Sequence, residues 1–110
     1  MAGKPFDRLL INAVDEALGL LGDSARQSTY YHLERKFKVS KSNIPRQLRQ
    51  FEEALDKIFG LGAKYIEISI MRNLYEKTGR PVEWREDNDL IFWKYIVSMK
   101  KSYTEPIKNS

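Results

Sequence analysis

The chain has 110 residues, contains no cysteine and carries a formal net charge of +4 at pH 7. The lack of cysteine excludes disulfides, thiolate nucleophiles and every zinc or iron–sulfur site built on Cys, and it is consistent with a reducing cytoplasm. Hydrophobic residues at 42% and charged residues at 31% are typical of a globular protein, and this length fits one domain. A single domain is therefore expected.

Membrane insertion is not expected from the hydropathy of the chain. No apolar run approaches the roughly 18 residues that a membrane-spanning helix needs. Near the N-terminus, Asp15 and Glu16 stand where the apolar region of a secretory signal peptide would be uncharged. We therefore expect a soluble protein in the cytoplasm with no membrane partner.

The first third of the chain predicts two helices. Apolar residues recur at spacings of three and four from about residue 6 to 21, which is the pattern of an amphipathic helix, and Gly22 ends it. Asp23 or Ser24 supplies a side-chain oxygen for the exposed amides of a second helix, which runs to Phe37 and is more polar than the first.

Two more helices are predicted in the middle of the chain. Pro45 is suited to a first helical turn, so a third helix is expected to start near it and to end at Gly60. A fourth helix is expected from Ala63 to Thr78, with Gly79 at its end. Its wide apolar face predicts a central position in the fold.

The fifth predicted helix, at about residues 88–103, contains the run LIFWKYIV, which is apolar on every side except at Lys94. Such a helix is buried on more than one side, and in a small chain this burial favours a second subunit. The predicted interaction surface of a homodimer or a protein partner consists of Phe92, Trp93, Ile96, Met99 and Tyr103. The alternative is that both apolar stripes of this helix pack inside one subunit.

These elements together predict an all-α protein with about five helices. Arg80 to Trp84 is expected to form an extended connection, since Pro81 cannot continue a helix. Asp87 or Asn88 is expected to cap the last helix. The single helical domain is expected to occupy residues 1–105, followed by a flexible tail at 106–110.

Four motifs in this order resemble the NitrOD5 type of archaeal domain: YYHLE, IP, FEEALDKIFGLGA and LYEKTG. The resemblance covers about residues 14–79. It implies an archaeal source and a helical module that serves as an output or regulatory domain in signalling proteins. It transfers no catalytic residue, ligand or reaction.

The excess positive charge of the chain lies in one stretch. Residues 35–50 contain six Lys or Arg and no Asp or Glu. The stretch joins the second and third predicted helices, as in a helix-turn-helix, although Glu34 and the long connection depart from that motif. The candidate nucleic-acid-binding residues are Lys38, Lys41, Arg46 and Arg49, with Gln47 and Gln50 within reach of base edges. The alternative interpretation is a solvated charged surface that binds nothing.

Catalysis and metal binding find little support in the sequence. His32 is the sole histidine, and without cysteine only carboxylates could complete a metal site around it. Gly-rich phosphate loops and the common hydrolase motifs do not occur. The expectation is therefore a non-enzymatic regulatory or scaffolding module without metal or cofactor that acts through protein–protein contacts. DNA binding through residues 35–50 is the alternative.

Overall fold

The computed structural model describes residues 5–79 and 91–104. This part of the chain forms helices without any β-strand, so the predicted all-α fold is confirmed. The helices are α1 (Pro5–Gly19), α2 (Asp23–Phe37), η1 (Lys41–Arg46), α3 (Leu48–Phe59), η2 (Gly60–Gly62), α4 (Ala63–Thr78) and α5 (Phe92–Thr104), where η1 and η2 are 3-10 helices. No helix in the described ranges has the length and apolarity needed to cross a membrane.

Several expectations lie outside the described residues. These are the extended connection at Arg80 to Trp84, the cap at Asp87 or Asn88, and the tail at 106–110.

The start of the third helix was predicted incorrectly. Pro45 belongs to the 3-10 helix η1, and the α-helix α3 begins three residues later at Leu48. Between them Gln47 has φ −128° and ψ 44°, which is not helical. Its amide donates to the carbonyls of Asn43 and Ile44, both at 3.1 Å, and so closes the 3-10 turn. Pro45 is the fifth of the six residues of η1. Proline fixes φ near about −65°, a value that both helix types share, so its position alone could not distinguish them.

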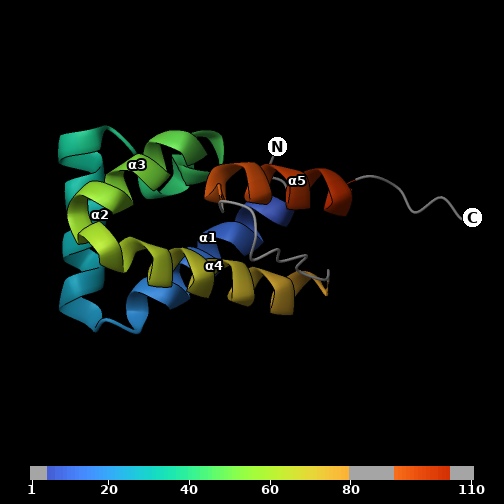
Figure 1. Ribbon diagram of the computed structural model, residues 1–110, viewed down its shortest axis with the longest axis horizontal. Coiled ribbons are helices and arrows are strands. Elements are labelled where there is room, and N and C mark those ends of the chain that lie inside the picture. The colour runs from blue at the N-terminus through green and yellow to red at the C-terminus, as the bar shows by residue number, and fades with distance from the viewer. Residues whose placement is uncertain (1–4, 80–90, 105–110) are drawn as a thin grey trace, which may run out of the picture.

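The helices pack in a short stack around one core (Figure 1). The most extensive contact is between α1 and α4, and α2 lies at one end of the fold, where it contacts α1 and α3. α3 and α5 follow one another along the other side and contact each other, and both also contact α4. Segments about forty residues apart in the sequence are thereby brought side by side at the junction of α3 and α5.

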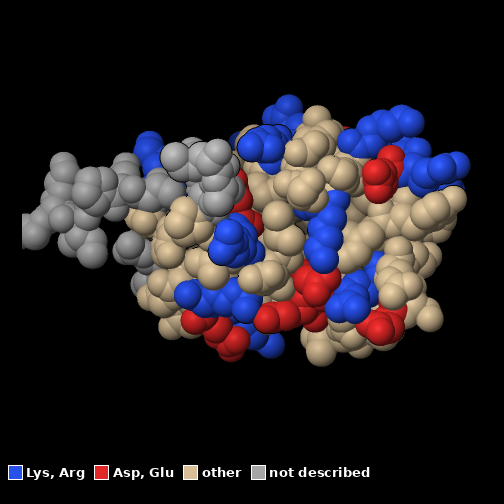
Figure 2. Space-filling model, turned by 180° about the vertical axis from the view of Figure 1, so that it is seen from behind, with Lys and Arg blue, Asp and Glu red and all other residues tan. Residues whose placement is uncertain are grey.

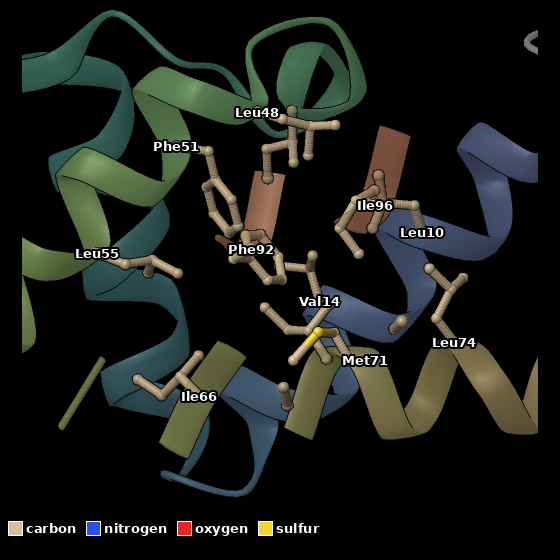
Figure 3. Close-up of a cluster of buried hydrophobic side chains, with 14 of the residues drawn as sticks. Leu10, Val14, Leu48, Phe51, Leu55, Ile66, Met71, Leu74, Phe92 and Ile96 are labelled. Carbon is tan, nitrogen blue, oxygen red and sulfur yellow. The ribbon is translucent and has the colours of Figure 1, made fainter. Parts of the chain in front are cut away.

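The core draws side chains from every long helix, with Leu33 as the fully buried residue of α2. Figure 3 labels core residues of α1, α3, α4 and α5. Phe51 of α3 and Phe92 of α5 lie with their ring centroids 6.2 Å apart and tilted by 48°. Around them the labelled side chains of Figure 3 are fully or almost fully buried: Leu10, Val14, Leu48, Leu55, Ile66, Met71, Leu74 and Ile96. α5 is therefore part of the core of a single chain.

α2 ends in a left-handed residue that is not glycine. Lys38 has φ 60° and ψ 34°, and the following amide, of Val39, donates to the Leu33 carbonyl at 2.9 Å. A left-handed residue at the end of a helix is most often glycine, because glycine has no Cβ to crowd the backbone in this conformation.

Replacing Lys38 by glycine should therefore raise the free energy of unfolding by about 0.5–1 kcal/mol. Urea denaturation of Lys38→Gly and of the control Ser40→Gly tests this. Ser40 has an ordinary extended backbone with φ −79°, so glycine there should lower stability by a similar amount. Destabilisation by both substitutions would contradict the expected relief of strain.

Candidate functional site

The basic residues of the stretch fall into two groups in the fold: those that are exposed without an ion pair to any residue that the structure describes, and Lys41, which is paired with an acidic side chain. Figure 2 shows Lys and Arg predominating at the upper right, the end where α2 stops and the connection to α3 begins. Of the four predicted nucleic-acid-binding residues, Lys38, Arg46 and Arg49 are exposed and form no ion pair among the described residues. Lys41 is also exposed, but it is bound to an acidic side chain of α1.

That acidic side chain is Asp15, which holds three elements together. Its Oδ1 accepts from Lys41 Nζ at 3.1 Å and from the Tyr30 hydroxyl at 3.0 Å, and its Oδ2 accepts from Arg26 at 3.2 Å. Lys41 Nζ also lies 4.8 Å from the centre of the Tyr30 ring. Lys41 thus joins η1 to α1 and α2, a structural role that the sequence pattern did not indicate.

The ionisation of this cluster follows from its contacts. Burial by itself would raise the pKa of Asp15, but hydrogen bonds from Lys41 and Tyr30 and the charges of Lys41 and Arg26 hold it below its usual value. Burial raises the pKa of Tyr30, and the Asp15 carboxylate raises it further. The cluster therefore remains an ion pair with a neutral phenol at neutral pH.

Arg46 and Arg49 lie at an open groove between the start of α3 and one face of α5. The groove has a volume of about 360 Å³. Its lining combines apolar and basic side chains, including Pro45, Arg46, Leu48, Arg49, Trp93 and Val97.

Within this groove Arg49 is stacked on an aromatic ring. Its guanidinium carbon lies 4.7 Å from the centre of the Trp93 ring, a cation–π geometry, and Lys94 Nζ approaches the same ring at 5.7 Å. Arg46 makes one weak contact, donating to Asn43 Oδ1 at 3.3 Å. Both guanidiniums therefore keep most of their donors available to a ligand.

The predicted interaction surface on the last helix needs correction. Phe92, Ile96 and Met99 are buried in the core of the chain, so they are not available to a partner in this fold. Tyr103 is partly buried, and its ring centroid is 5.8 Å from that of Phe6. Trp93 is also partly buried.

Two apolar stripes run along α5: Phe92, Ile96 and Met99 face the core, whereas Trp93 and Val97 line the groove, with Val97 48% exposed. Which stripe the core would bury was not determined by the sequence, because both are apolar. Trp93 is thus the member of the predicted surface that lines the groove, together with Arg46 and Arg49 of the predicted basic residues, and it contacts Arg49. The meeting of Trp93 with Arg49 was missed because the two residues are far apart in the sequence and belong to different helices.

α3 does not carry the uniformly basic outer face expected of a DNA-recognition helix. Arg49 and Gln50 are exposed near its start, but Glu53 and Asp56 are exposed further along. These carboxylates would face the phosphates of a duplex if the helix entered the major groove. The arrangement therefore suits a small basic patch better than a groove-reading helix.

His32 has no metal-binding surroundings in the described part of the chain. It is half-buried, and its ring packs edge-on against that of Tyr31 with centroids 5.9 Å apart. The potential metal ligands that do gather are three carboxylates, of Glu52, Asp56 and Glu67.

No protein-family model, curated protein or solved structure matches this chain. The resemblance of residues 14–79 to the NitrOD5 type therefore stays a prediction from the sequence.

Proposed function

We propose that this protein is a non-enzymatic helical module with a regulatory or scaffolding role, and that it binds a partner protein through the groove between α3 and α5. The observation that carries the proposal is the exposed Arg49 guanidinium stacked on Trp93 beside the apolar side chains of Leu48 and Val97. The expected partner segment presents an apolar side chain next to an aspartate or glutamate.

The chemistry of the groove supports such a ligand. Trp and Arg are the residue types that most often dominate the binding energy of protein interfaces. Stacking on Trp93 restricts the rotamers of Arg49, so less side-chain entropy is lost when a carboxylate binds. A guanidinium can also donate two parallel hydrogen bonds to one carboxylate. Pro45, Leu48 and Val97 offer apolar contact within the same groove.

DNA binding is the second candidate, and the exposure of Lys38, Arg46 and Arg49 favours it. The ion pair of Lys41 with Asp15 and the acidic residues on the outer face of α3 weaken it. The two candidates differ in salt dependence, because each phosphate that a protein neutralises releases counterions.

The test begins with selection from a random twelve-residue peptide display library, using the wild type as bait. We expect the enriched peptides to combine acidic and apolar residues. In fluorescence anisotropy with the best synthetic peptide, Arg49→Glu should weaken binding about 30-fold, corresponding to about 2 kcal/mol at an interface hot spot. Trp93→Ala should weaken it to a similar extent.

Lys57→Glu is the matched control, since it reverses one exposed charge at the far end of the same helix. It should leave peptide affinity within about twofold, as expected for an exposed charge outside the interface. Failure to enrich any peptide, together with salt-sensitive binding of a random-sequence duplex that Arg46→Glu and Arg49→Glu abolish, would favour the DNA candidate. Light scattering that shows a mass rising with protein concentration would instead indicate a second copy as the partner.

A further inference from the structure

Three carboxylates converge where α3 and α4 pack. Glu52 and Asp56 are four residues apart on α3, so both point to the same side of that helix. Glu67 comes from the first half of α4 and faces them. One oxygen from each of the three side chains lies within 4.8 Å of the other two.

Glu67 is the unusual member of this cluster. Its side chain is 0% exposed, and neither carboxylate oxygen has a hydrogen-bond partner. Burial raises the pKa of Glu67 to about 7, and the negative charges of Glu52 and Asp56 act in the same direction against the opposing charge of Lys64. A buried carboxylate without a partner is costly, and one held beside two further carboxylates is costlier still. A cation among the three would remove that cost.

Glu52 is held in position from a third helix. Its Oε1 accepts the backbone amide of Trp93 at 2.9 Å, which satisfies one free amide in the first turn of α5. A ligand fixed by such a contact loses little side-chain entropy when a metal binds. Its remaining lone pairs are free for an ion. Asp56 is exposed, so an ion reaches the cluster directly from solvent and keeps water ligands on that side.

We propose that Glu52, Asp56 and Glu67 form a binding site for a divalent cation that prefers oxygen ligands. Three points no more than 4.8 Å apart always fit in a circle with a radius of about 2.8 Å, so an ion at its centre is close to all three oxygens. Calcium binds oxygen at about 2.3–2.6 Å, so the three carboxylate oxygens would need to move by only a few tenths of an ångström to coordinate it. Magnesium, at about 2.0–2.1 Å, requires a tighter closure of the carboxylates. Zinc is disfavoured because the cluster contains no nitrogen or sulfur ligand.

Isothermal titration of the metal-free full chain with CaCl₂ tests this site. We expect one ion to bind per chain with a dissociation constant in the micromolar to millimolar part of the range known for calcium sites. Binding should also raise the melting temperature in a parallel thermal scan. Asp56→Asn and Glu67→Gln should each weaken the affinity about tenfold or more. Asp56 is exposed, so its substitution leaves the fold intact and keeps the test valid if Glu67→Gln alters packing.

Glu53→Gln is the control, because it removes one charge from an exposed position of the same helix outside the cluster. Its calcium affinity should match that of the wild type. The proposal is overturned if calcium shows no saturable binding up to millimolar concentration. It is also overturned if Glu53→Gln weakens binding as much as Asp56→Asn does, since that would indicate general charge screening. Tighter binding of magnesium than of calcium would contradict the expectation, based on ionic size, that the site prefers calcium.

Discussion

Replacing Phe92 by alanine is expected to lower the free energy of unfolding by about 3–5 kcal/mol, the usual cost of removing a large buried aromatic side chain. The Phe92 ring is 0% exposed and packs against Phe51 of α3. Its removal would leave a cavity between α3 and α5 and would loosen the contact that holds α5 to the rest of the fold. Urea denaturation followed by circular dichroism measures the loss.

Val97→Ala is the control, because Val97 lies on the same helix but is 48% exposed. It should change stability by no more than about 0.5 kcal/mol. Both measurements are made at two protein concentrations that differ about a hundredfold, since unfolding of a dimer depends on concentration. A small effect of Phe92→Ala, or an effect that changes with concentration, would contradict the packing of α5 within one chain and favour the homodimer.

The helices of this protein were largely predictable because their signals are local. Gly60 and Gly79, which were predicted to end the third and fourth helices, are the C-caps of α3 and α4 and have positive φ, which other residues adopt only at a cost. α1 instead ends at Gly19, and Gly22, which was predicted to end it, is the N-cap of α2. Apolar spacing then defined the helices between them. The start of α3 was misplaced because the backbone angle that Pro45 imposes suits an α-helix and a 3-10 helix equally well, and Pro45 belongs to the 3-10 helix η1.

The sites were less predictable because they depend on how helices pack. Both stripes of α5 are apolar, so the sequence left open which one faces the core. The position of Trp93 in the groove depends on that choice and was therefore not predictable either. The acidic cluster had one local signal that was overlooked. Glu67 lies between Ala63 and Met71 at helical spacing, on a stripe whose other members are buried. A charged residue in such a position marks a candidate site.

The stability of the protein is expected to fall as the pH rises through Glu67's titration. In the unfolded chain this carboxyl releases its proton near its ordinary pKa of 4.5, whereas in the folded chain the pKa is about 7. Between these values the folded state binds more protons than the unfolded state, so the free energy of unfolding decreases with pH. The whole decrease is about 3 kcal/mol for a difference of this size.

Glu67→Gln should remove this decrease. Glutamine has nearly the same shape, does not titrate, and its amide can donate to the carboxylates of Glu52 or Asp56. At pH 8 the variant is therefore expected to be more stable than the wild type by about 1–3 kcal/mol, and below pH 5 the difference should vanish or reverse. Urea denaturation from pH 4 to pH 9 in the presence of EDTA measures this without interference from bound cations.

Glu53→Gln serves again as the control, because Glu53 is exposed on the same helix as Glu52 and Asp56. Its stability profile should run parallel to that of the wild type across the whole range. If the stability profile of Glu67→Gln also ran parallel to that of the wild type, Glu67 would titrate normally and gain a partner in solution. A variant that is less stable than the wild type at pH 8 would mean that the ionised carboxylate is itself a favourable part of the fold, which is the opposite of what its burial beside two acidic side chains predicts.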